Sequence, residues 1–153
     1  MASSVDYIVN DEKSYPSLLI EVKALPDRSE QWARKMRRNI SVHSPLPEAP
    51  FFLLALPDQF FLWVDHAHLD PMAPPSHTVD ARPLLSPYFD RAGVSPEKAA
   101  GETFELIVWT WLLRIIQSPS SDALPEGYGE WLLDTGLFEA IQGGHIEQSG
   151  IPA

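Results

Sequence analysis

The chain has 153 residues, of which 44% are hydrophobic and five are Trp; this length and composition exclude disorder of the whole chain and suit one folded domain. It contains no cysteine, which excludes disulfides and thiolate metal sites. The net charge of −10 argues against broad electrostatic adhesion to nucleic acid. No segment resembles a signal peptide or reaches membrane-spanning length, so we expect a cytoplasmic protein without a membrane partner.

The first elements in chain order are two predicted strands joined by a turn. Residues Val5–Val9 and Ser17–Ala24 are rich in apolar and β-branched side chains, which favour strands. Asn10–Ser14 between them has the composition of a turn. The pattern therefore predicts a β-hairpin.

Acidic and basic side chains gather on one face of this hairpin. Because side chains alternate along a strand, Glu21 and Lys23 project from the same face of an otherwise apolar segment. A hairpin symmetric about Lys13 and Ser14 places Asp6 opposite Glu21. Two carboxylates can hold Mg²⁺, and a nearby lysine can orient or deprotonate an attacking water. The alternative is an ion pair at a strand end, which contributes little to stability.

A helix rich in basic residues is predicted over residues 29–41, with Ser29 as its N-cap. Its apolar stripe consists of Trp32, Ala33, Met36 and Ile40. The basic side chains expected on its flanks and back are Arg34, Lys35, Arg37 and Arg38. Such a charge run is commonly a solvated helix face. Its functional interpretation is contact between Arg34, Lys35 and Arg38 and the phosphates of DNA.

Two further strands are predicted after this helix. Phe51–Leu56 is a continuous apolar run, which is typical of a strand buried on both faces. A turn at Pro57 and Asp58 leads into Gln59–Val64, which predicts a second hairpin. The order strand, strand, helix, strand, strand predicts an α/β protein with a mixed sheet.

Residues 66–94 are rich in Pro and His and are expected to form an irregular loop. A weak alternative is a Zn²⁺ site formed by histidines and aspartates such as His66, His68 and Asp70. No helical i, i+4 histidine pair defines a metal geometry here, so the pattern favours a solvated loop.

Residues 95–153 are predicted to form a mainly helical extension. A helix with a wide apolar stripe is predicted over residues 102–117, and its Trp109 lies off that stripe without an evident packing partner. A short helix or strand pair is predicted over residues 131–141. The last residues, 146–153, are expected to form an edge strand or to fray.

The order of an Asp-bearing strand, a Glu-x-Lys strand, a basic helix and a buried strand resembles the PD-(D/E)xK nuclease superfamily, which includes many restriction endonucleases. The resemblance rests on the sequence Leu19–Ala24 and on the strand pair that follows, and it covers residues 5–65. A weaker likeness extends over residues 95–142. It implies a restriction-endonuclease-like mixed sheet flanked by helices, with a helical C-terminal extension, in a single domain whose nuclease-like core is residues 1–65.

The resemblance also implies a chemistry. It implies a Mg²⁺-dependent nuclease, with Mn²⁺ as a substitute metal, that hydrolyses phosphodiester bonds of DNA. Asp6 and Glu21 would be the metal ligands together with the carbonyl of Val22. Lys23 would be the catalytic lysine.

Two departures from the family pattern leave an alternative open. Val5 stands where the family has Pro, and the family's fold has a helix, often bearing a further acid, and a strand ahead of the first acid. This chain begins five residues before Asp6, so we expect a short or truncated version, or one completed by a homodimer or partner chain. The alternative function is a catalytically inactive, nuclease-like interaction module that binds protein through an exposed apolar sheet face.

Overall fold

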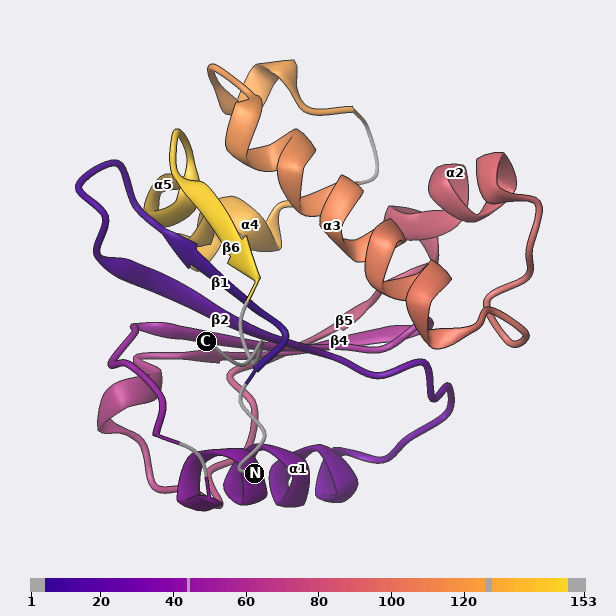
Figure 1. Ribbon diagram of the computed structural model, residues 1–153. Coiled ribbons are helices and arrows are strands. Elements are labelled where there is room, and N and C mark those ends of the chain that lie inside the picture. Colours follow the sequence, from indigo (N-terminus) through magenta and orange to yellow (C-terminus); the bar gives the residue numbers. More distant parts are fainter. Residues whose placement is uncertain (1–4, 44, 126–127, 149–153) are drawn as a thin grey trace.

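The computed structural model describes residues 5–43, 45–125 and 128–148, and its centre is a six-stranded mixed sheet (Figure 1). The strands are β1 (Tyr7–Asn10), β2 (Pro16–Val22), β3 (Phe51–Ala55), β4 (Gln59–Val64), β5 (His77–Asp80) and β6 (His145–Gln148). Their order across the sheet is β5-β4-β3-β2-β1-β6. Only the pairing of β2 with β3 is parallel, and the other neighbours in this sheet are antiparallel.

The predicted hairpin of β1 and β2 is confirmed, and a side chain stabilises its turn. Asp11 Oδ1 accepts hydrogen bonds from the backbone N–H groups of Lys13 and Tyr15, at 2.9 Å and 3.0 Å. Ser14 adopts a left-handed backbone conformation with φ of 69°. Asp, Asn and Ser are suited to such turns because their short polar side chains bond to nearby backbone groups.

Helices cover both faces of the sheet (Figure 1). The helices are α1 (Glu30–His43), α2 (Arg82–Ala92), α3 (Gly101–Gln117), α4 (Trp131–Asp134) and α5 (Leu137–Ile141), with short 3₁₀ turns at His66–His68 and Ser121–Ala123. α1 lies on one face, and α2 to α5 lie on the other. Since parallel strands cannot be joined by a tight turn, α1 forms the crossover from β2 to β3. The α/β class with a mixed sheet flanked by helices is therefore confirmed.

The alternation along β2 divides the core in two. Leu18 and Ile20 face the α3 side, whereas Leu19 faces α1. On the α3 side the fully buried Trp111 stacks on Trp131 with ring centroids 6.2 Å apart. Large aromatic rings therefore fill much of this half of the core.

Trp109, which lies off the apolar stripe of α3, packs against Tyr7 of β1. Its ring meets the ring of Tyr7 edge to face, with centroids 5.3 Å apart. This contact fixes α3 over β1, close to the N-terminal hairpin.

The expectation that residues 66–94 form an irregular loop is wrong. They contain β5, which pairs with β4, and the helix α2. Pro83 suits the first turn of a helix, where backbone N–H groups have no intrahelical partner. Pro87 lies inside the helix, and burial of Leu84, Leu85 and Phe89 offsets the hydrogen bond lost there. The prolines in this segment therefore led to the prediction of a loop where a helix packs on the core.

The exposed apolar sheet face expected for an interaction module is not found in the described part of the chain. The apolar side chains of the central strands β1 to β4 are buried on both faces of the sheet, under α1 on one face and under α2 to α5 on the other. Large exposed apolar residues are scattered over the surface and are Tyr15, Leu25, Val42, Leu106 and Leu133. No helix within the described ranges is long and apolar enough to cross a membrane.

The C-terminal tail forms the expected edge strand over His145–Gln148, and residues 149–153 lie outside the described residues. β6 pairs with β1, so one edge of the sheet comes from the C-terminal extension. β5 at the opposite edge also follows residue 65. The sheet is therefore not confined to residues 1–65, which were expected to form the nuclease-like core.

Substitution Gly144→Ala tests the close approach of β6 to β1. A Cβ at this position would lie 2.1 Å from the carbonyl oxygen of Asn10, a backbone atom that cannot move without disturbing the strand pairing. We expect a loss of about 1–3 kcal/mol in the free energy of unfolding, measured with urea. Gly101→Ala is the matched control, since a Cβ there meets no atom within 4 Å. Equal unfolding free energies for the two variants would contradict this packing.

Candidate functional site

Asp6, Glu21 and Lys23 lie together at the end of the sheet where β2 finishes. The Asp6 N–H donates to the carbonyl of Ile20 at 2.9 Å. Asp6 Oδ2 accepts a hydrogen bond from the backbone N–H of Val22 at 2.7 Å. These two bonds hold Asp6 against the strand residues on either side of Glu21, so its carboxyl lies beside that of Glu21.

Lys23 forms an ion pair with Glu21. The distance from Lys23 Nζ to Glu21 Oε2 is 3.2 Å. The Lys23 side chain is 36% exposed, whereas Glu21 as a whole is 5% exposed. The Lys23 N–H donates to the Ala55 carbonyl at 3.0 Å, which extends the β2–β3 ladder to this residue. A buried carboxyl thus meets an ammonium that also reaches solvent.

The pKa of Glu21 is raised from 4.5 to about 7. Burial is the largest cause, and the negative charge of Asp6 is the next; Lys23 acts in the opposite direction. Glu21 Oε1 is buried without a hydrogen-bond partner among the described residues. Glu21 therefore retains its proton toward neutral pH, because its charged form is buried beside a second carboxyl. Asp6 and Glu21 are called the acid pair below.

Glu105 of α3 joins this pair, and sequence reasoning missed it. Burial raises its pKa, and so does the negative charge of Asp6. The Tyr7 hydroxyl donates to the Glu105 backbone carbonyl at 3.3 Å. Burial, followed by the charges of Glu105 and Asp6, raises the pKa of Tyr7 to about 12. A single Glu beside an apolar stripe carries no signal in the sequence, because only the docking of α3 brings it to Asp6.

The basic residues of α1 fall into two groups. Lys35 and Arg38 are exposed, and Arg34 lies 3.8 Å from Glu30 one turn earlier. Within the described residues no ion pair links them to the acid pair. They are thus a charged, solvent-facing helix surface, and their predicted contact with phosphates stays a prediction.

The expectation that Arg37 lies on a solvated flank of α1 is wrong. Arg37 is 1% exposed and packs beneath the loop after β4. It lies on the same side of the helix as Ala33 and Ile40, which are also buried. Its hydrogen-bond partners come from the loop after β4, which the helical pattern alone does not reveal.

The acid pair fits Mg²⁺ by the chemistry of its donors. Carboxylate oxygens are hard ligands, and the buried, unpartnered Oε1 of Glu21 is a suitable donor. The described residues contain no arrangement of three or more His, Asp or Glu side chains that could hold a metal ion. The pair would thus supply two ligands rather than a complete cage, and metal-ligand roles for Asp6, Glu21 and the Val22 carbonyl stay predictions.

The weak Zn²⁺ alternative around His66 gains no support. His66 is buried rather than solvated, and its Nδ1 already accepts a hydrogen bond from Arg37 at 3.1 Å. His68 lies in an exposed part of the same turn. His66 instead accepts hydrogen bonds from Arg37, which holds the segment after β4 against α1.

Comparisons of the chain with models of protein families, with curated proteins and with solved structures found no match. The resemblance to PD-(D/E)xK nucleases therefore stays a prediction, and it rests on the sequence motif alone.

Substitution Glu21→Gln tests the acid pair through the pH dependence of stability. The unfolded chain releases the Glu21 proton near pH 4.5, whereas the folded chain retains it to about 7. The free energy of unfolding should therefore fall as pH rises between these values and level off above them. We expect Glu21→Gln to lack this fall and to exceed the unsubstituted protein by about 1–3 kcal/mol at pH 8.

The measurement is urea unfolding at pH 4 and pH 8. Glu97→Gln, at an exposed position, is the matched control and should follow the unsubstituted protein at both pH values. The same pH dependence in Glu21→Gln as in the control would show that Glu21 is not the group responsible.

Proposed function

We propose that the protein is a Mg²⁺-dependent nuclease of the PD-(D/E)xK type, which hydrolyses phosphodiester bonds of DNA at Asp6, Glu21 and Lys23. The observation that carries this proposal is the joining of two carboxyls and a lysine at one end of the sheet, with the pKa of Glu21 raised to about 7. Two acids held together in a buried position destabilise the fold when both are ionised. Such arrangements are concentrated at functional sites.

Each residue has a role that follows from its surroundings. Asp6 and Glu21 would hold the metal, and bound Mg²⁺ would supply an acidified water and neutralise charge on a phosphoryl oxygen. Lys23 reaches from solvent to the acid pair, where its ammonium can orient the water or stabilise charge on the phosphate. Glu105 is a positioning residue, because its negative charge lies close enough to Asp6 for the two carboxyls to influence each other.

The arrangement of elements supports a restriction-endonuclease-like fold with an altered chain order. The family pattern has a strand and an acid-bearing helix ahead of the first acid. Here β6 pairs with β1, and α3 brings Glu105 to Asp6. A strand and a helix from the C-terminal extension thus flank the Asp6 strand. This arrangement supports the proposal without a homodimer or partner chain to complete the sheet.

Binding of DNA would use a local surface, because the whole chain carries a net charge of −10. The exposed Lys35 and Arg38, with Arg34, form a basic strip on α1. The chain enters α1 from the end of β2, where Glu21 and Lys23 lie. Phosphate contacts along this strip would position the backbone without reading its sequence, and they would weaken as salt is added.

Cleavage of plasmid and single-stranded DNA tests the catalytic lysine. With Mg²⁺ or Mn²⁺ present, we expect Lys23→Ala to lower the cleavage rate at least ~100-fold, because a positioned charge is lost at the reacting phosphate. Lys13→Ala is the matched control, since Lys13 is an exposed lysine in the hairpin turn. Equal rates in all three proteins would indicate a contaminating nuclease. No cleavage by folded, unsubstituted protein would favour the inactive module.

Titration calorimetry with MgCl₂ tests the acid pair independently of cleavage. At pH 6.5 we expect binding to release a proton, because the metal competes with the proton on Glu21. Proton release is measured from the difference in heat between two buffers of unlike ionisation enthalpy. Glu21→Gln should abolish both binding and release, while Glu97→Gln should retain them. Unchanged binding by Glu21→Gln would contradict the metal assignment.

A further inference from the structure

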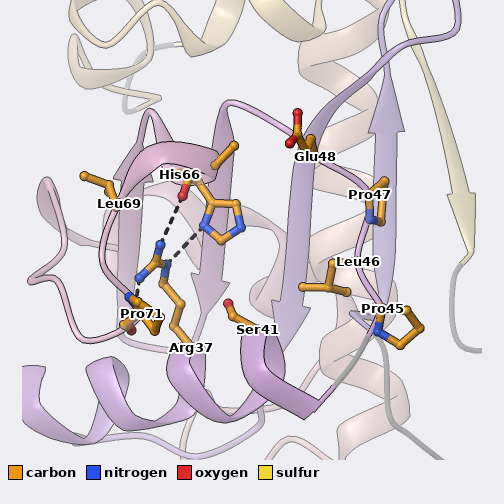
Figure 2. Close-up of a pocket in the computed structure, with 10 residues that line it drawn as sticks. Arg37, Ser41, Pro45, Leu46, Pro47, Glu48, His66, Leu69 and Pro71 are labelled. Atoms are coloured by element: carbon orange, nitrogen blue, oxygen red, sulfur yellow. Dashed lines mark hydrogen bonds between the residues drawn. The ribbon is translucent and has the colours of Figure 1, made fainter.

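A pocket of about 330 Å³ lies at the end of the sheet where β3 begins (Figure 2). Its walls come from the C-terminal half of α1, the loop before β3 and the segment after β4. The parallel strands β2 and β3 both begin at this end, whereas Glu21 lies where β2 finishes. The pocket is therefore a separate site from the proposed nuclease centre.

Arg37 contributes a buried positive charge to the pocket wall. Its Nε donates to His66 Nδ1 at 3.1 Å, and its Nη1 donates to the carbonyls of Asp70 and Pro71 at 3.0 Å and 3.1 Å. Its Nη2 donates to the carbonyl of His66 at 3.3 Å. These acceptors are all uncharged, and a guanidinium has five N–H donors, so one Nη2 hydrogen has no acceptor among the described residues. The guanidinium carbon also lies 5.3 Å from the centre of the Trp63 ring.

His66 adds a second donor. Because its Nδ1 accepts the hydrogen bond from Arg37, the neutral ring carries its proton on Nε2. Burial, and then the charge of Arg37, lowers the pKa of His66 to about 4, so the ring is neutral at neutral pH. The residue is 8% exposed and lines the pocket. Figure 2 shows its second nitrogen turned away from Arg37, toward the wall formed by Leu46 and Pro47.

Ser41 adds a third donor. Its Oγ is buried and has no hydrogen-bond partner in the described part of the chain. In Figure 2 the hydroxyl oxygen points toward the ring of His66. Burying a hydrogen-bond donor without an acceptor costs free energy. A ligand with several acceptor atoms would therefore be stabilised beside Arg37, His66 and Ser41. The buried charge of Arg37 favours an acceptor that is itself negative.

The rest of the lining is apolar or exposed. Leu46, Pro47 and Leu69 supply apolar side chains to the lining, and Figure 2 shows Leu46 and Pro47 across from His66, with Leu69 on the side of Arg37. Glu48 also lines the pocket, but it is an exposed residue. Figure 2 shows its carboxylate at the far rim, pointing away from Arg37. The exposed Asp70 uses Oδ1 to accept the N–H of Met72. Water screens both acids far more than it screens Arg37.

We propose that this pocket binds a small organic acid, with its carboxylate at Arg37, Ser41 and His66 and its apolar body against Leu46 and Pro47. The carboxylate offers two oxygens and one negative charge to three donors and one buried positive charge. The volume of the pocket admits a body of the size of one aromatic ring.

Calorimetry with three probes tests the ligand class. Benzoate combines the carboxylate with an apolar ring, benzamide keeps the shape without the charge, and inorganic phosphate keeps a negative charge without the ring. We expect benzoate to bind with a dissociation constant on the order of 1 mM and each of the other two at least ~10-fold more weakly. Equal binding of benzamide would overturn the anionic character. Phosphate binding as tight as that of benzoate would overturn the organic acid.

Variants then locate the binding site. Ala67→Glu adds a larger side chain and a partly screened negative charge to the pocket lining and should weaken benzoate binding about 3-fold to 10-fold. Ala92→Glu makes the same charge change at the exposed end of α2 and should bind as the unsubstituted protein does. Ser41→Ala should weaken binding about 3-fold to 10-fold, through the loss of one donor. Circular dichroism confirms that each variant is folded.

Two outcomes would overturn the site. No heat with 20 mM benzoate in the unsubstituted protein would exclude a ligand of this class at this affinity. Equal weakening by Ala67→Glu and Ala92→Glu would show that benzoate responds to the overall charge rather than to the pocket. Benzoate binding should be unchanged in Glu21→Gln, so a failure of the nuclease proposal leaves this test intact.

Discussion

The parallel pairing of β2 with β3 is the constraint that determines where both candidate sites lie. It forces the chain to cross one face of the sheet through α1 before β3 can begin. The acid pair therefore lies where β2 finishes, and the pocket lies where β3 starts. α1 spans the distance between them, with exposed basic residues on its outer side and Arg37 on its inner side. One crossover thus serves two chemically different ends of the molecule.

The two ends bury charges of opposite sign. At the acid pair, like charges are held together, and Lys23 compensates them only in part. At Arg37, a single positive charge is surrounded by carbonyls, an imidazole and an indole ring, none of which is charged at neutral pH. Both arrangements are costly in a low-dielectric interior. Each would become more favourable with an ion of the opposite sign beside it, which is the common physical basis of the two proposals.

The sequence predicted the elements whose information is local. The hairpin, the basic helix and the next strand pair follow from periodicity and turn composition, so the meeting of Asp6 with Glu21 follows from the strand register alone. The sequence could not reveal Glu105, because its approach to Asp6 depends on how α3 docks on β1. It also misjudged Arg37, since the loop that buries it supplies partners from distant positions. Prolines hid α2, because their effect depends on position within the helix and on packing.

The pairing of β1 with β6 has a consequence for the order in which the chain can fold during synthesis. Tyr7 lies opposite Gln148, so two segments from the extremes of the described chain complete the same edge of the sheet. Contacts between such distant segments form late, because a long stretch of chain must be ordered first. β1 is therefore made long before its partner and remains an unprotected sheet edge until β6 has emerged from the ribosome. Asp6, just before that strand, gains its final surroundings only after α3 and β6 have been made.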